Sequence, residues 1–74
     1  MNRVSVKSSN LSSIGYDAPT GMLEVKFKHG GVYQYFDVPA TVFDSLLATH
    51  ESGKSVGAHF DLHVKKAGYR YKEL

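Results

Sequence analysis

The sequence predicts an α+β fold, in which a small antiparallel sheet of three to four strands, with a hairpin at its centre, is packed by two short helices. Residues 23–28 alternate between apolar and charged side chains, and residues 32–38 are rich in aromatic and β-branched side chains. Both patterns are typical of strands. Residues 39–68 instead carry apolar side chains at the spacing of helical faces.

The central hairpin is predicted to turn at residues 29–31, where two glycines permit positive φ. The length of its loop decides which side chains share a face of the sheet. A two-residue loop would place Tyr33 and Tyr35 beside Lys26 and Lys28 on the face opposite the apolar side chains. A three-residue loop would bring both tyrosines into the core. The sequence leaves these alternatives open.

Two further elements are predicted around the hairpin. A short strand is expected around residues 11–16, ahead of a turn that contains proline and glycine. After the hairpin, Pro39 suits the first position of a helix, because its φ is already helical. Apolar side chains spaced three and four residues apart extend this helix to about His50.

The C-terminal third is predicted to form a second helix and then an extended end. Ser55 is a suitable N-cap, and Gly68 is a suitable stop. Residues 60–64 also show an apolar alternation that would suit a strand, but the length and charge pattern of the segment favour the helix. Residues 69–72 are predicted to be a terminal strand or an extended tail.

Length and composition exclude several classes of protein. The 74 residues form a single domain, residues 1–74, and the absence of cysteine excludes disulfides, thiolate zinc sites and cysteine nucleophiles. So small a core favours a stabilising partner, so self-association into a homo-oligomer is expected. With no long apolar run and no signal-peptide pattern, we expect a cytoplasmic protein that does not contact a membrane.

Basic residues gather near the C-terminus. From Lys54 onward there are five basic residues and two acidic ones, which gives this end a charge of about +3. Residues 65–72 interleave cations with aromatic rings, a composition that suits phosphate contacts and base stacking. A solvated helix end would explain the first two lysines equally well. The candidate nucleic-acid-binding residues are Lys26, Lys28, Tyr33, Tyr35, Lys65, Lys66, Tyr69, Arg70, Tyr71 and Lys72.

The order of short motifs resembles the KTSC domain family. The motifs are Ser8-Ser9-Asn10, Ile14-Gly15-Tyr16-Asp17, Leu23-x-Val25-x-Phe27, Tyr33-x-Tyr35, Val38-Pro39, Ser55-x-Gly57-x-x-Phe60, His63-Val64-Lys65 and a late Tyr69. This family is named for a module at the C-terminus of some lysyl-tRNA synthetases and also occurs as small stand-alone bacterial and phage proteins. The resemblance implies a fold without an established activity, and the synthetase context implies RNA binding.

Other chemistry finds little support in the sequence. His59 and His63 are four residues apart, with Asp61 between them, but a structural zinc site needs four ligands. We therefore expect polar or capping roles for these side chains, and no metal or other cofactor. The sequence contains neither a Gly-x-Ser-x-Gly nucleophile motif nor a phosphate-binding loop, so we expect no catalytic residues and no enzyme activity.

Two classes of function remain open. The first is a small binding module for RNA or single-stranded nucleic acid, which uses lysines for phosphate and tyrosines for bases. The alternative is a module that binds a protein or small ligand, or a homo-oligomer in which the aromatic side chains form the interface. The exposure of the hairpin tyrosines discriminates between them.

Overall fold

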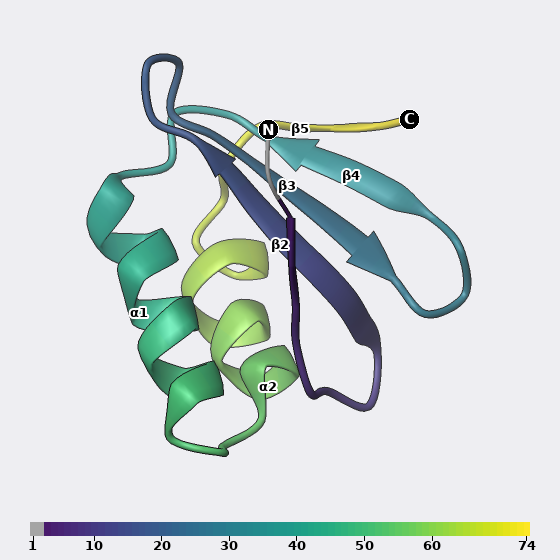
Figure 1. Ribbon diagram of the computed structural model, residues 1–74. Coiled ribbons are helices and arrows are strands. Elements are labelled where there is room, and N and C mark those ends of the chain that lie inside the picture. Colours follow the sequence, from purple (N-terminus) through teal and green to yellow (C-terminus); the bar gives the residue numbers. More distant parts are fainter. Residues whose placement is uncertain (1–2) are drawn as a thin grey trace.

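The computed structural model describes residues 3–74, which form one open antiparallel sheet with two helices on one of its faces (Figure 1). The strands lie side by side in chain order. They are β1 (Arg3–Ser5), β2 (Leu11–Asp17), β3 (Met22–Phe27), β4 (Val32–Tyr35) and β5 (Tyr71–Glu73). The α+β class is confirmed, and the sheet of five strands is slightly larger than the three to four that we predicted.

The two edge strands are the short ones. β1 was not predicted, because its three residues are too few to show a period in the sequence. It pairs with β2 through Val4 opposite Ile14. At the other edge, β5 shows that the C-terminal end forms a strand, with Tyr71 opposite Tyr35 of β4.

The hairpin between β3 and β4 has a three-residue loop, residues 28–30, one position earlier than predicted. The Gly30 N–H donates to the Phe27 carbonyl at 3.0 Å, and the Phe27 N–H donates to the Gly31 carbonyl at 2.9 Å. Gly30 has a φ of 102°, which an L side chain rarely adopts. A turn followed by a glycine with positive φ is a common three-residue hairpin connection.

The three-residue loop decides which side chains of β3 and β4 share a face of the sheet, a choice that the sequence left open. Leu23 lies opposite Tyr35, and Val25 lies opposite Tyr33. Directly opposed residues point to the same face of a sheet, so both tyrosines lie on the apolar face and not beside Lys26. The three-residue alternative is therefore the one that forms. The face of exposed tyrosines beside lysines, which would have favoured nucleic-acid binding, does not form, and Tyr35 is only 5% exposed.

The helices follow the predicted order with two local differences. α1 (Ala40–Glu51) begins at Ala40, and Pro39 is its extended N-cap and not its first helical residue, one position from the prediction. α2 (Val56–Phe60) follows Ser55 and continues into a π-helical turn, η1 (Asp61–Lys65), in which the Lys66 N–H donates to the Asp61 carbonyl at 3.0 Å. The strand alternative for residues 60–64 is wrong.

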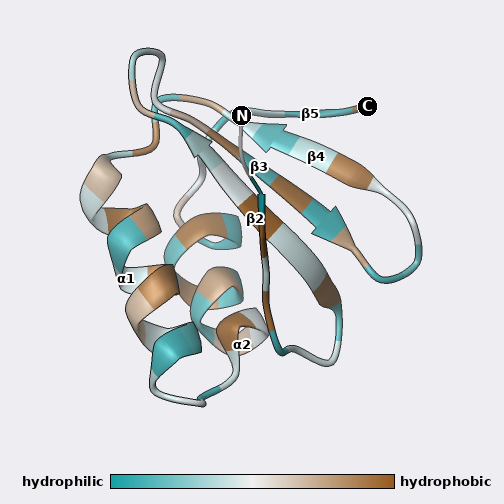
Figure 2. Cartoon of the chain, in the orientation of Figure 1, coloured by the Kyte–Doolittle hydropathy of each residue, from teal (hydrophilic) through white to brown (hydrophobic). Residues whose placement is uncertain are grey.

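The core lies between the sheet and the helices. Leu23 and Val25 of β3, Leu46 of α1 and Phe60 of α2 are each at most 1% exposed. Burying such a side chain stabilises a fold by about 1.5–3 kcal/mol. Figure 2 shows hydrophobic positions recurring on β3 and on both helices, separated by hydrophilic ones, as the amphipathic patterns require.

The loop between β1 and β2 packs against the start of α2 at Gly57. A Cβ added to Gly57 would lie 2.5 Å from Ser8 Oγ and would also collide with Asn10 Oδ1. Ser8 Oγ itself donates to Asn10 Oδ1 at 2.8 Å and accepts the Leu11 N–H at 3.2 Å. The glycine therefore makes room for a loop that is held together by its own hydrogen bonds.

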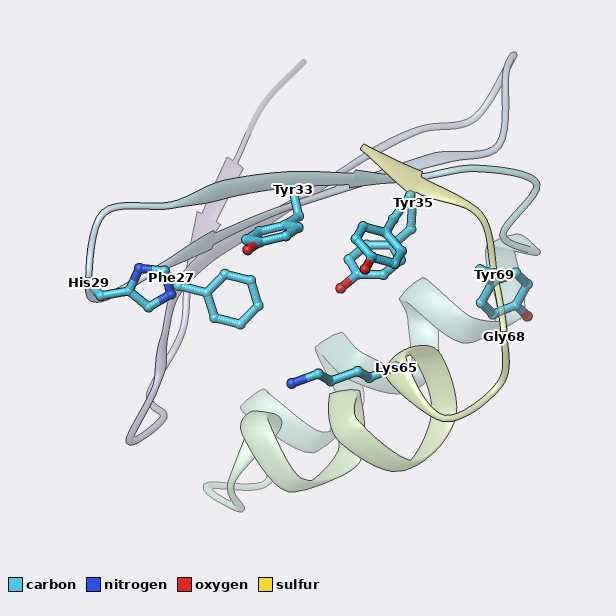
Figure 3. Close-up of a pocket in the computed structure, with 8 residues that line it drawn as sticks. Phe27, His29, Tyr33, Tyr35, Lys65, Gly68 and Tyr69 are labelled. Atoms are coloured by element: carbon cyan, nitrogen blue, oxygen red, sulfur yellow. The ribbon is translucent and has the colours of Figure 1, made fainter. Parts of the chain in front are cut away.

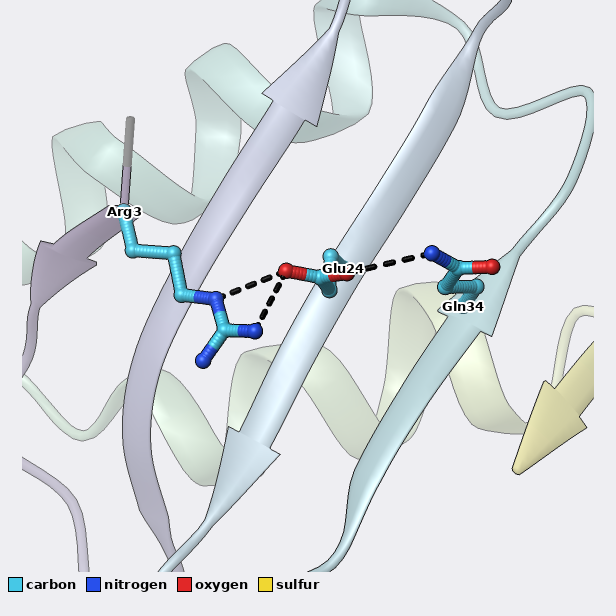
Figure 4. A network of polar contacts seen from close by, with 3 residues as sticks. All are labelled: Arg3, Glu24 and Gln34. Carbon is cyan, nitrogen blue, oxygen red and sulfur yellow. Dashed lines mark hydrogen bonds and ion pairs between the residues drawn. The ribbon is translucent and has the colours of Figure 1, made fainter. Parts of the chain in front are cut away.

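The opposite face of the sheet carries a polar network (Figure 4). Arg3 crosses β2 at Gly15, which has no side chain, and its Nη2 lies 2.6 Å from Glu24 Oε2. Gln34 Nε2 donates to Glu24 Oε1 at 3.1 Å. Burial alone would raise the pKa of Glu24, but the hydrogen bonds from Gln34 and Arg3 and the guanidinium charge together hold it below its ordinary value.

Candidate functional site

The main pocket lies between the edge of the sheet and the end of the helical layer (Figure 3). Its volume is about 610 Å³. Strands β3, β4 and β5 supply one side, η1 supplies another, and the segment that joins η1 to β5 closes a third. The lining residues are Phe27, His29, Tyr33, Tyr35, Lys65, Gly68, Tyr69 and Tyr71.

The connection from η1 to β5 shapes this pocket. Gly68 has a φ of 84°, which suits a glycine just after the end of a helix. The chain turns there and returns to the sheet, where the Phe36 N–H donates to the Arg70 carbonyl at 2.9 Å. Tyr69 and Tyr71 are thereby brought to the pocket from the C-terminal segment.

The aromatic rings pack against one another at angles and form one wall of the pocket. Tyr33 is nearly perpendicular to Phe27, with an interplanar angle of 86° and centroids 5.3 Å apart. Tyr71 is tilted by 47° to Tyr33 and by 36° to Tyr35. Tyr35 is 5% exposed, whereas Tyr71 is 63% exposed, so the pocket grades from buried floor to open rim.

The phenols are held in their neutral form. Burial, the neighbouring carboxylate of Glu73 and the nearby Tyr71 raise the pKa of Tyr33. Burial, together with the two neighbouring phenols, raises the pKa of Tyr35. Both rings are therefore uncharged at neutral pH, and their hydroxyl groups can donate and accept hydrogen bonds.

One cation reaches into this aromatic pocket. Lys65 is the last residue of η1, and its side chain extends below the tyrosines toward Phe27 (Figure 3). Within this π-helical turn Val64 is fully buried, whereas Lys65 is exposed. His29 stacks on Phe27 with an interplanar angle of 8° and brings an imidazole ring to the pocket.

Half of the predicted binding residues line the pocket, and the others do not. The lining residues are Tyr33, Tyr35, Lys65, Tyr69 and Tyr71. Lys28 lies in the hairpin loop, and Lys26 and Lys72 point to the opposite face of the sheet. Lys66 Nζ lies 3.6 Å from Asp61, and Arg70 Nη2 lies 3.3 Å from Asp37.

The prediction missed Phe27, His29 and Gly68 as pocket residues. Phe27 and His29 flank the hairpin loop, so their position depends on the loop length that the sequence left undecided. The sequence did contain evidence for Phe27, because it alternates with charged residues in the same strand as Leu23. It therefore lies on the same face of the sheet as Tyr33. Gly68 was expected to end the second helix, and that expectation is compatible with its place in the wall.

The histidines form a separate polar cluster between the helices. The rings of His59 and His63 have centroids 4.2 Å apart, and His59 Nε2 is hydrogen bonded to Ser45 Oγ. Burial and the neighbouring His63 lower the pKa of His59. Across residues 3–74, no group of three or more histidine or acidic side chains is arranged to hold a metal ion.

Comparison with known proteins places the chain among a set of related sequences. The KTSC domain model matches residues 7–71. An uncharacterized protein of Stutzerimonas stutzeri is 42% identical over 71 residues, which cover 96% of this chain and 94% of the relative. A lysine–tRNA ligase of Nostoc punctiforme is 29% identical over 92% of this chain, a match that spans only 11% of the ligase.

The same fold occurs in a solved structure. The crystal structure of a KTSC domain protein from Yersinia pestis superposes with a TM-score of 0.84 at 34% sequence identity. The superposition covers 99% of this chain and 96% of the other. Within the described residues, no helix is long and apolar enough to cross a membrane.

Proposed function

The chain belongs to the KTSC domain family. We propose that it is a small non-enzymatic module that binds RNA or another single-stranded nucleic acid. The observation that carries the proposal is the aromatic pocket with Lys65 at its side. Aromatic rings bind unpaired bases by stacking, at about 1–3 kcal/mol per base, and lysine binds the phosphate.

The electrostatics of the pocket support a base as occupant. Tyr33 and Tyr35 have pKa values raised above the ordinary value of 10.0, so both phenols are neutral at neutral pH, and the negative charge beside the rings is the Glu73 carboxylate next to Tyr33. Their hydroxyl groups offer the donors and acceptors that a base edge requires. The ammonium group of Lys65 supplies the charge for the phosphate next to the base.

The relatives add a second line of support. A lysine–tRNA ligase contains a segment similar to nearly the whole of this chain, and its name makes an RNA the partner of that protein. We extend this partner class, and a cytoplasmic location, to the present chain. A cytoplasmic location fits a sequence without cysteine.

The proposal is tested by fluorescence anisotropy with labelled 12-mers of poly(U) and poly(dT) at about 50 mM salt, where phosphate contacts are strong. Tyr71→Ala should weaken binding by about 5- to 150-fold, the equivalent of about 1–3 kcal/mol of lost stacking. Lys72→Ala is the matched control, because this neighbour in the same exposed strand points to the opposite face.

Circular dichroism of each variant checks that it remains folded. If the wild-type protein binds neither 12-mer at tens of micromolar, the proposal is wrong. Equal losses in Tyr71→Ala and Lys72→Ala would place the binding surface elsewhere than in the pocket.

A further inference from the structure

The arrangement of the rings limits how many bases the site can hold. A strand that binds by stacking successive bases needs several aromatic faces presented along its path. Here Tyr33 meets Phe27 at 86°, and Tyr71 leans over Tyr33 and Tyr35 at 47° and 36°. Their centroids are 5.3–6.0 Å apart, so the rings contact one another and form one continuous wall, which offers a surface to one planar group and no separate faces for a row of bases.

The charges near the site point the same way. Among the lysines and arginines of residues 3–74, only Lys65 lines the pocket. Arg70 pairs with Asp37, and Lys66 pairs with Asp61. Lys26 and Lys72 lie on the far face of the sheet, and the Glu73 carboxylate lies beside Tyr33. The lysine charge at the pocket is therefore that of Lys65, which is enough for one phosphate.

The pocket volume agrees with a small ligand. Its volume of about 610 Å³ lies within the range of about 300–1,000 Å³ that is usual for sites of small molecules and cofactors. A nucleoside monophosphate belongs to this size class, whereas an oligonucleotide does not. Tyr35 at the floor and Tyr71 at the rim give the base a buried end and an open end.

We infer that the pocket is a site for a single nucleotide, with its base against the wall formed by Tyr33, Tyr35 and Tyr71 and its phosphate at Lys65 Nζ. This inference rests on the proposed function and specifies its ligand. The shared chemistry is a planar heteroaromatic base joined to a phosphate, which comes from a free nucleotide or from one residue of a strand. A free nucleoside monophosphate therefore occupies the pocket without the rest of a strand.

The first experiment compares ligands of different length. Uridine 5′-monophosphate and adenosine 5′-monophosphate are titrated into the full chain by NMR and used to displace the labelled 12-mer. We expect each mononucleotide to shift the amide signals of residues 27–35 and 65–71 and to displace the 12-mer. The logarithm of the affinity for a single strand falls against the logarithm of the salt concentration with a slope of about −0.7 for each phosphate neutralised. With one phosphate at Lys65, the affinity for the 12-mer should therefore fall only about threefold between 50 and 200 mM salt.

The second experiment tests the position of the phosphate. Uridine, which lacks the phosphate, should bind about tenfold more weakly than uridine 5′-monophosphate. Lys65→Gln should remove this difference, because it removes the charge and retains most of the side-chain length. Lys26→Gln, on the opposite face of the sheet, is the matched control and should preserve the difference.

The outcomes distinguish the single-nucleotide site from the broader proposal that the protein binds nucleic acid. If the 12-mer binds but millimolar mononucleotide does not displace it, the single-nucleotide site is wrong and the nucleic-acid function stands. A loss of 12-mer affinity of more than about 30-fold between the two salt concentrations would also overturn it, because several phosphates would then be bound. If no ligand binds, both proposals fall.

Discussion

Replacement of Gly57 by alanine tests how the β1–β2 loop is held against the helices. The added Cβ would lie 2.5 Å from Ser8 Oγ and closer still to Asn10 Oδ1, so the ends of these two side chains must shift. Ser8 Oγ also accepts the N–H groups of Leu11 and Asn10, and a displaced hydroxyl loses these bonds.

The expected change in the free energy of unfolding follows from two costs and one gain. Overpacking of a tight contact costs about 1–3 kcal/mol. Each lost hydrogen bond costs about 0.5–1.5 kcal/mol. Alanine gains up to about 1 kcal/mol over glycine in helix propensity, and less near a helix start. Because the atoms that meet the new methyl group are side-chain ends, the lower part of the combined range applies, and we expect Gly57→Ala to lower the free energy of unfolding by about 1–3 kcal/mol.

Urea denaturation followed by circular dichroism measures this change, and Ala58→Gly at the neighbouring exposed position measures helix propensity alone. In a background with both Ser8→Gly and Asn10→Gly, the two oxygens that meet the new methyl group are absent, so the cost of Gly57→Ala should fall by about 1 kcal/mol or more. A Gly57→Ala variant as stable as the wild type, or an equal cost in both backgrounds, would refute the packing role of Gly57.

Three further outcomes concern the core, the polar network and the assembly. Leu46→Ala should lower the free energy of unfolding by about 2–4 kcal/mol, because Leu46 is fully buried in α1; a melting temperature unchanged within error would contradict its burial. The pKa of Glu24 is lowered in the folded protein, so the ionised carboxylate contributes to the free energy of unfolding above its ordinary pKa of 4.5, and this contribution is lost as the pH falls through the pKa of the folded protein. In urea titrations from pH 6 to 3, the difference in free energy of unfolding between wild type and Glu24→Gln should therefore narrow as the pH falls. A difference that stays constant would show that Arg3 does not stabilise the carboxylate. If self-association contributes to stability, the melting temperature should rise over about two decades of protein concentration, and an invariant value would show that the monomer suffices.

The elements with a local pattern were predictable from the sequence. β3 shows a period of two over six residues, and α1 shows helical spacing behind Pro39. β1 has three residues and no such pattern, so nothing local distinguishes it from a loop. It exists because β2 offers it an edge to pair with.

The candidate site was predictable only in composition. Tyr33, Tyr35, Lys65, Tyr69 and Tyr71 were chosen for their chemistry, and the structure brings all of them to one pocket. Their common face depends on whether the hairpin loop has two or three residues, and adjacent glycines permit either. The π-helical turn before Lys65 also has no local signal, because buried Phe60 and Val64 have the four-residue spacing of an ordinary α-helix.

The edge position of Tyr71 links the pocket to local opening of the sheet. Tyr71 is both the first residue of β5 and part of the pocket wall. A three-residue edge strand with every side chain exposed detaches at a free energy far below that of global unfolding. Any ligand that touches Tyr71 must therefore tighten the pairing of β5 with β4. Slower hydrogen exchange at the amides of residues 71–73, with unchanged exchange in the core strands, would be the signature of an occupied pocket.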